Sequence, residues 1–303
     1  MTKRGWLLFA AMAVIWGIPY LLIKVAVAEF PPASLVFLRT AIGAALLLPL
    51  ALARDALRPL VPRWRWILAY TVVEVAAPWF FLSDGERRIT SSLAGLLIAA
   101  VPFVGALLAW LTGGDDRPDA RRVLGLVIGF VGVAAVVGLN VSFDDLGAVG
   151  EVALVVLGYA TGAMIIARKL RDLPSVGVVV ASLALTALAY APFGIAQLPT
   201  TPPSFPAAGA VGILAVVCTA VAFLVFFALI AEVGAARATV ITYLNPAVAL
   251  VLGVALLGEP LSVTIVVGFA LILVGSVLAT RRSPPSEPRT ARTVPRGADA
   301  EAR

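Results

Sequence analysis

Histidine is absent from the 303-residue chain, and cysteine occurs once, as Cys218. Without histidine, the protein cannot form a histidine metal centre or a histidine proton relay. A single cysteine excludes an intrachain disulfide and a multi-cysteine metal site. We therefore expect no metal, no cofactor and no catalytic centre. Any proton that the protein binds for coupling must be carried by a carboxylate.

Charged residues are also scarce, at 13% of the chain against about 25% in a soluble domain. Hydrophobic residues make up 61%, and the mean hydropathy is +1.03. Runs of roughly 20 apolar residues, long enough to cross a bilayer, recur along the chain. These proportions indicate an integral membrane protein with lipid as its solvent. The net charge of +6 does not indicate nucleic-acid binding, because the basic residues lie at the ends of the apolar runs.

Ten apolar runs separated by short polar breaks predict an all-α protein of ten transmembrane helices. The unalternating Leu, Val and Ala content favours helices over a β-barrel. We expect the helices at 5–28, 33–53, 66–83, 90–112, 121–139, 148–168, 175–197, 207–230, 235–257 and 262–280. Residues 283–303 are rich in Pro, Arg, Ser and Glu, a composition that predicts a disordered cytoplasmic tail.

Lysine and arginine gather at the N-terminus and after every second predicted helix. By the positive-inside rule, this alternation predicts cytoplasmic N- and C-termini in a bacterial inner membrane. The pair Arg87-Arg88, in the third connection, is the exception. The first run, with Ala26-Val27-Ala28 after it, also resembles a secretory signal with a cleavage site. Pro19 and Lys24 interrupt that run, which favours a permanent packed helix.

The chain contains an internal repeat. Residues 94–102 align with 238–246, so that Pro102 falls over Pro246. The match extends through Gly114-Asp115 and Gly258-Glu259 to similarly spaced glycines. Each half, at 1–140 and 146–280, carries five predicted helices, and an odd number makes the second half enter the membrane inverted. Inverted repeats are typical of transporters, with the substrate site near the bilayer midplane between the halves.

The chain resembles the EamA-type transporters of the drug/metabolite transporter superfamily over residues 1–280. The matching residues are Trp16-Gly17, Lys24, Arg39, Pro246, Gly258-Glu259-Pro260 and Gly268. The first half departs from the family pattern, with Gly114-Asp115-Asp116 where Gly-Glu is usual. The resemblance implies two inverted five-helix EamA repeats. It also implies a secondary transporter that moves amino acids, other metabolites or drug-like molecules across the plasma membrane by alternating access, and we expect export.

Three charged residues, Lys24, Arg39 and Glu74, fall within predicted spans. An unpaired charge there costs about 2.5 kcal/mol or more, so such residues mark candidate sites. Glu74 is a candidate for a proton, the expected coupling ion, or for a substrate amine. Lys24 and Arg39 are candidates for a substrate carboxylate. The alternative is a structural ion pair, or snorkelling of the two basic side chains to the membrane surface.

Aromatic side chains inside the spans are further candidates, because their faces bind amphipathic or cationic molecules. These candidates are Trp16, Tyr159 and Tyr243. Tyr20 and Trp79 rank below them, because aromatic residues at helix ends often serve only as interfacial anchors. Pro19, Pro102 and Pro246 each remove a helical hydrogen bond, and the freed carbonyls can line a cavity. Thr242 and Asn245 lie beside Pro246 and join the candidates, although simple kinking is the alternative.

Other functions have weaker support. Asp115-Asp116-Arg117-Pro118-Asp119 has the D-D-x-x-D spacing of magnesium-diphosphate enzymes. The other acidic pair, Asp144-Asp145, falls on the opposite membrane face, so the two clusters cannot share a metal. A channel or lipid flippase is the main alternative to a carrier, and a membrane scaffold or sensor is a third. The partners we expect are a small-molecule substrate and the lipid bilayer. Composition and spacing identify neither the cargo nor the oligomeric state.

Overall fold

The computed structural model describes residues 1–112, 120–140 and 142–280. Ten helical segments of this part are long and apolar enough to cross a membrane. They span Lys3–Ala26, Pro32–Ala53, Arg58–Gly85, Ser91–Leu111, Ala120–Gly138, Phe143–Leu170, Ser175–Ala196, Phe205–Val233, Val240–Leu257 and Val263–Thr280. The predicted ten-helix architecture is confirmed. The predicted tail, 283–303, lies outside the described residues.

The first half is built from spans that are mostly composite. The first span contains α1 (Lys3–Ile15) and α2 (Pro19–Ala26), and the second is α3 (Pro32–Ala53). The third contains η1 (Arg58–Arg63), α4 (Trp64–Tyr70), η2 (Thr71–Ala76) and α5 (Ala77–Gly85). The fourth contains α6 (Ser91–Ile98) and α7 (Val101–Leu111), and the fifth is α8 (Ala120–Asn140).

The second half follows the same order. Its first span contains η3 (Phe143–Asp145), α9 (Leu146–Ile165) and η4 (Ile166–Leu170), and its second is α10 (Ser175–Ala196). The next contains α11 (Phe205–Ala215), η5 (Val216–Val221) and α12 (Ala222–Val233). The last two contain α13 (Ala235–Ala238), η6 (Thr239–Tyr243) and α14 (Asn245–Leu257), then α15 (Val263–Thr280).

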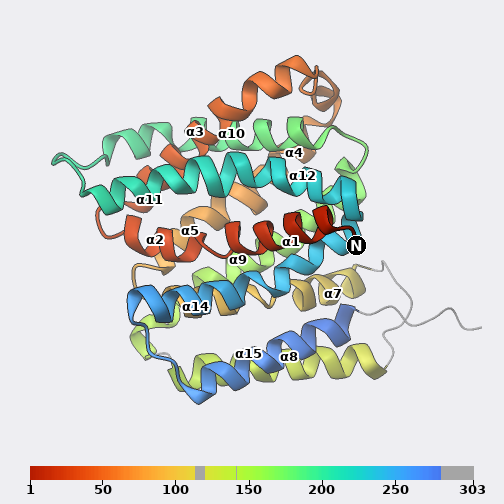
Figure 1. Cartoon of the computed structure of the whole chain (residues 1–303), viewed down its shortest axis with the longest axis vertical. Coiled ribbons are helices and arrows are strands. Elements are labelled where there is room, and N and C mark those ends of the chain that lie inside the picture. The colour runs from red at the N-terminus through yellow and green to blue at the C-terminus, as the bar shows by residue number, and fades with distance from the viewer. Residues whose placement is uncertain (113–119, 141, 281–303) are drawn as a thin grey trace, which may run out of the picture.

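The spans lie side by side and run between two faces of the molecule (Figure 1). We call the face at which α1 begins and α15 ends the terminal face, and the other the distal face. Helices α8 and α15 form one edge, while α3, α4 and α10 form the other (Figure 1). Neighbouring spans come from both halves, since α3 packs on α10, α5 on α9, α6 on α14 and α8 on α15. The core is therefore shared between the halves.

Proline and glycine shape this packing. The first, fourth and ninth spans are interrupted just before Pro19, Pro102 and Pro246, because proline has no N–H to continue the helix. Gly132 on α8 meets α15 so closely that a Cβ there would lie 2.8 Å from the Gly268 carbonyl oxygen. Small residues allow such close approach of transmembrane helices.

Two of the three π-helical segments in the described residues occupy matching places in the two halves. These are η2 in the third span and η5 in the eighth, each of six residues. The repeat alignment that places Pro102 over Pro246 also places η2 over η5 to within one residue. Single π-helical turns inside α-helices are frequent at functional sites. Both segments contribute to the polar cluster described next.

Candidate functional site: a buried polar cluster between the two halves

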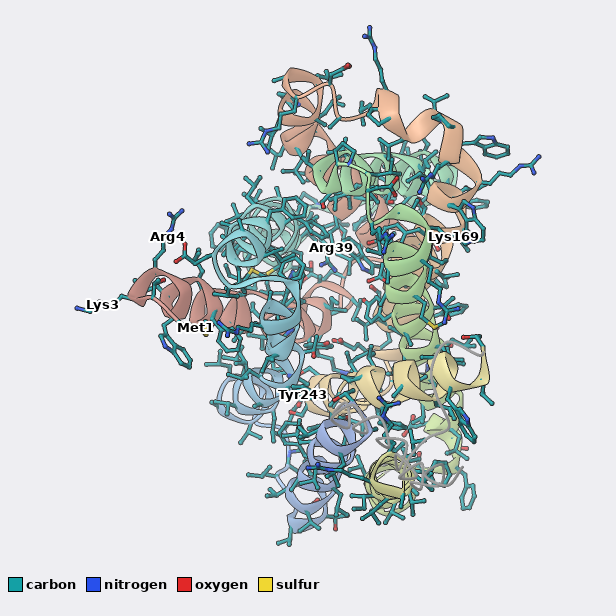
Figure 2. All side chains as sticks on the ribbon, turned by 90° about the vertical axis from the view of Figure 1, so that its right-hand side faces the viewer. Met1, Lys3, Arg4, Arg39, Lys169 and Tyr243 are labelled. Carbon is teal, nitrogen blue, oxygen red and sulfur yellow. The ribbon has the colours of Figure 1, made fainter. Side chains whose placement is uncertain are left out.

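Arg39 lies on α3 near the middle of the molecule, as the view from the terminal face shows (Figure 2). Its side chain is buried, with 8% exposure. The guanidinium carbon lies 3.6 Å from the centroid of the Trp79 ring, and Nε donates a hydrogen bond to Thr219 Oγ1 at 3.0 Å. Among the described residues, no carboxylate lies within ion-pair distance of the guanidinium.

Thr219 is positioned by η5. Its hydroxyl donates to the Leu214 carbonyl at 2.8 Å, so its oxygen is free to accept from Arg39. Trp79 is on α5, directly after η2. Two elements, α5 of the first half and η5 of the second, therefore hold the Arg39 side chain without neutralising its charge. A buried cation of this kind is costly unless a partner supplies the opposite charge.

Glu74 is on η2 and points toward α9, where Gly162 provides the space for its carboxylate. A Cβ at Gly162 would overlap Glu74 Oε2. That oxygen is buried and has no hydrogen-bond partner in the described part of the chain. An ionised carboxylate in such surroundings requires a proton, a cation or a donor to satisfy it.

Tyr159 on α9 links these two groups, because it interacts electrostatically with both Arg39 and Glu74. Tyr20, on α2 and also buried, interacts with Arg39 and Tyr159. The cluster of Tyr20, Arg39, Glu74, Trp79, Tyr159 and Thr219 therefore combines one cation, one carboxylate and three aromatic side chains. We call it the central cluster.

Other residues predicted as candidates lie outside the central cluster. Trp16 packs on α12, with its ring 4.7 Å from Phe226 and 6.1 Å from Phe223. Tyr243 lies toward the terminal face, where its hydroxyl is 3.1 Å from Thr280 Oγ1 (Figure 2).

Two candidates stand beside the break at Pro246. With its amide turned to face two carbonyls, the Asn245 side-chain NH2 group donates to the carbonyl oxygens of Ala13 and Ile241. The bond to Ala13 joins α14 to α1. Thr242 is half-buried. Whether these residues contact a substrate stays a prediction.

Lys24 reaches the distal face rather than the central cluster. Its ammonium donates to the carbonyl oxygens of Glu86 at 2.6 Å and Ile89 at 2.8 Å. Close by, the carboxylate of Glu259 accepts from the backbone N–H groups of Ser91 at 2.7 Å and Ser92 at 2.9 Å. We call these two sets of hydrogen bonds the distal contacts.

Glu259 lies in the connection between α14 and α15 but acts on a helix of the other half. Residues Gly258-Glu259-Pro260 form a turn, with Gly258 in a left-handed conformation at φ 66°. A carboxylate at this place could stabilise the start of the helix that follows it. Its oxygens instead cap α6 of the other half, where two unpaired N–H groups and the positive helix end favour an anion.

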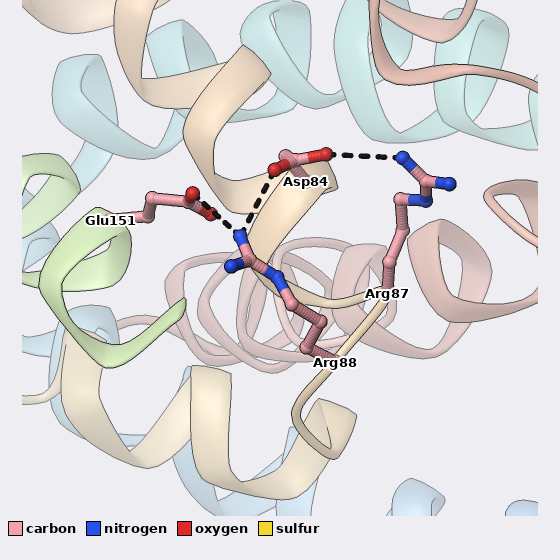
Figure 3. A network of polar contacts seen from close by, with 4 residues as sticks. All are labelled: Asp84, Arg87, Arg88 and Glu151. Atoms are coloured by element: carbon pink, nitrogen blue, oxygen red, sulfur yellow. Dashed lines mark hydrogen bonds and ion pairs between the residues drawn. The ribbon is translucent and has the colours of Figure 1, made fainter. Parts of the chain in front are cut away.

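The Arg87-Arg88 pair, which departs from the alternating charge pattern of the sequence, takes part in ion pairs (Figure 3). Asp84 contacts Arg87 at 3.3 Å and Arg88 at 3.0 Å, and Arg88 also contacts Glu151 at 2.6 Å. The hydrogen bond that Arg88 donates to the Glu151 carboxylate raises the pKa of Arg88 above its usual value. This network joins α5 to α9 and so connects the two halves at the distal face.

Matching contacts connect the halves at both faces. At the distal face, Glu29 accepts from the N–H of Ser204 at 2.7 Å and also from its hydroxyl. At the terminal face, Arg63 donates both terminal nitrogens to Asp172 at 2.8 Å. Ser204 and Arg63 each stand at the N-cap of a helix in corresponding spans, α11 and α4.

A separate cavity of about 440 Å³ lies near the distal ends of α3, α5 and α10. Phe80 and Tyr190 form part of its wall, with stacked rings 5.9 Å apart, and Asp84 and Arg87 line it as well. The Tyr190 hydroxyl donates to the Ala76 carbonyl at the end of η2. Asp84, Arg87 and Tyr190 in this wall already have partners, so the cavity offers a charged ligand less than the central cluster does.

Sequence reasoning missed the pairing of Trp79 with Arg39 and the burial of Glu86. Nothing in the sequence distinguishes Glu86 from an ordinary acidic residue in a connection. The acidic motif at 115–119 lies outside the described residues, as does the departure at Gly114-Asp115-Asp116. Within the described residues, no group of three Cys, Asp or Glu side chains is placed to hold a metal ion.

The model of the EamA-like transporter family matches residues 3–138 and 148–281, which together cover most of the chain. The chain belongs to the EamA-like transporter family. This EamA-like transporter is 25% identical over 284 residues to the uncharacterized transporter YvbV of Bacillus subtilis, with 92% of each chain covered. It is 28% identical over 276 residues to the uncharacterized inner membrane transporter YedA of Escherichia coli K12, covering 89% and 88%.

A known structure supports the fold. One crystal structure superposes on this EamA-like transporter with a TM-score of 0.64 and 21% identity, covering 92% and 97% of the two chains. At that identity the likeness concerns the fold alone. The chain is thus a multi-pass membrane transporter of the drug/metabolite type with two EamA repeats.

Proposed function

We propose that this EamA-like transporter carries a small molecule with both an amine and a carboxylate, such as an amino acid or a related metabolite or drug, by alternating access. The central cluster supports this cargo. Within the described part of the chain, Arg39 is a buried cation with no carboxylate partner, and Glu74 is a carboxylate with an unpaired buried oxygen. A zwitterion satisfies both, with its carboxylate on Arg39 and its amine on Glu74, while the aromatic faces hold its side chain.

Alternating access is supported by the way the halves meet. Both faces carry hydrogen bonds and ion pairs between the halves, at Glu29–Ser204 and at Arg63–Asp172. Both contacts are exposed, and exposed polar pairs contribute little to stability. They can therefore break and reform as one face opens and the other closes. Inverted repeats allow the same motion at both faces.

We further propose a bacterial inner-membrane location with both termini in the cytoplasm. Lys3, Arg4 and the basic connections place positive charge at the terminal face. The Arg87-Arg88 exception is paired with Asp84 and Glu151, as described above. In this orientation the distal face meets the periplasm. The proposed direction of net movement is export of the cargo from the cytoplasm. A proton that binds a carboxylate such as Glu74 is the proposed coupling ion.

Purified protein in proteoliposomes tests the proposal. Labelled amino acids and cationic drugs are offered with and without a pH gradient. Saturable uptake that is accelerated by unlabelled cargo on the far side is the expected result for a carrier. Linear, non-saturable flux would identify a channel, and transfer of labelled lipid between leaflets would identify a flippase. Failure of every zwitterion to bind or move, with only simple cations or anions transported, would contradict the proposed cargo.

A further inference from the structure

Glu86 is the most deeply buried carboxylate described in the protein. It follows α5 in the connection to α6, and its exposure is 0%. Both carboxylate oxygens are buried, and neither has a hydrogen-bond partner among the residues described. The nearby Lys24 ammonium instead donates to the backbone carbonyls of Glu86 and Ile89. Glu86 is thus enclosed by the distal contacts while its own side chain is left unsatisfied.

Charged and titratable groups face Glu86 from several elements. They are Lys24 and Tyr20 on α2, Arg39 on α3, Tyr159 on α9 and Glu259 beyond α14. Lys24 and Arg39 favour the ionised carboxylate, whereas Glu259 opposes it. Burial is the largest effect and raises the pKa of Glu86 well above its ordinary value.

We propose that Glu86 is a proton-binding site that links closure of the distal face to protonation. When the distal contacts open, water reaches the carboxylate and the proton leaves to the aqueous phase on that side. When they close, Glu86 takes a proton from the same phase and becomes a neutral acid that burial tolerates. The inference requires only that the distal contacts open, and it depends on neither the cargo nor Glu74.

The direction of the pH effect follows from linkage. The closed state binds the proton more tightly than the open state, so acid on the distal side favours closure and alkali favours opening. One linked proton changes the open-to-closed ratio by up to about tenfold per pH unit. The open-to-closed ratio changes at this limiting rate only at pH values between the pKa of Glu86 in the open state and its higher pKa in the closed state.

A cysteine placed inside the distal contacts reports their opening. Ser92 is 1% exposed and its hydroxyl has no described partner, so Ser92→Cys is a small change. It is introduced with Cys218→Ala, which removes the one native thiol. A membrane-impermeant maleimide is added from the distal side of proteoliposomes over a series of pH values. Thr201→Cys, at an exposed position in the distal connection between α10 and α11, corrects for the pH dependence of the thiol reaction itself.

With Glu86 present, the corrected labelling rate should rise with pH by up to about tenfold per unit. With Glu86→Gln, which imitates the neutral acid, labelling should stay slow and flat. The matched control is Asp144→Asn, at an exposed carboxylate of η3 on the distal side, which should keep the rising profile. The same profile in the Glu86→Gln protein as in its parent would overturn the proposal.

Glu86→Asp keeps the test decisive if the glutamine variant does not fold. It retains a titratable carboxyl but moves it one methylene away from Lys24 and Glu259. The rising profile should persist with its midpoint displaced along the pH axis. An unchanged midpoint would show that another group sets the profile and would also overturn the proposal.

Discussion

Glu74 and Thr219 are symmetry-related, since each is the fourth residue of a six-residue π-helical segment in corresponding spans of the inverted halves. Their neighbours correspond as well. Arg39 is the eighth residue of the 22-residue α3, and Ser182 is the eighth residue of the 22-residue α10. Arg39 bonds to Thr219, whereas Ser182 Oγ is buried without a described partner. Both charges of the central cluster therefore come from the first half, while the corresponding positions of the second half carry the hydroxyl groups of Ser182 and Thr219.

Replacing Glu74 by glutamine should abolish pH-dependent transport without unfolding the protein, because the amide keeps the shape but cannot bind a proton or an ammonium ion. Transport is compared at several pH gradients in proteoliposomes, and folding is checked by monodispersity after purification. Glu232→Gln, near the terminal face, is the matched control and should transport normally. Unchanged pH dependence in Glu74→Gln would exclude the assigned role.

Gly162→Ala should displace the Glu74 carboxylate, since the added methyl group occupies its position. Overpacking of this kind costs about 1–3 kcal/mol, so the apparent melting temperature should fall and transport should weaken. Gly150→Ala is the control on the same helix, because nothing lies within 4 Å of a Cβ there. That variant should be as stable as the parent or slightly more stable, by up to about 1 kcal/mol. Equal melting temperatures for the two variants would show that the packing at Gly162 is not tight.

Arg39→Lys should reduce binding of carboxylate-bearing cargo by tenfold or more, corresponding to about 1.4 kcal/mol. Lysine keeps the charge but loses the planar group that stacks on Trp79 and bonds to Thr219. Arg65→Lys tests an exposed arginine 5.5 Å from the Trp64 ring and should have no effect. Affinity is read from the concentration dependence of exchange. A normal affinity in Arg39→Lys would mean that charge alone suffices.

The Glu29–Ser204 contact should weaken in acid. Hydrogen bonds from Ser204 lower the pKa of Glu29 in the folded protein. The contribution of this contact to the stability of the folded protein is therefore complete above the ordinary glutamate pKa. It is lost as the pH falls through the lowered pKa that Glu29 has in the folded state. Thermal unfolding of Glu29→Gln should lack this acid-dependent part of the parent's profile. Parallel profiles for parent and variant across that range would contradict the prediction.

Hydropathy predicted the spans well because a bilayer imposes length and composition on each of them. It could not predict which face of a span is buried. Leu183 is 1% exposed and Leu188 is 72% exposed on the same α10, because lipid and protein core are equally suited to leucine. The periodicity that orients helices in soluble proteins is therefore weak here.

For the same reason, the central cluster was predicted only in part. Arg39, Glu74 and Tyr159 could be selected because polar groups inside spans are costly. The contact of Trp79 with Arg39 could not be predicted, because it depends on the packing of α3 against α5, which are not adjacent in the sequence. Glu86 lies in a connection, where an acidic residue is unremarkable until the fold encloses it.

The interruption before Pro19 divides the first span into two pieces that share α14 as a neighbour but otherwise pack on different helices. Helix α1 packs on α12, while α2 packs on α11 and α6. The chain can bend at this point because proline leaves a backbone carbonyl without its usual donor. The first span can therefore bend near its middle. Its distal arm, which carries Lys24 and Tyr20, can swing with the distal contacts while its terminal arm stays anchored.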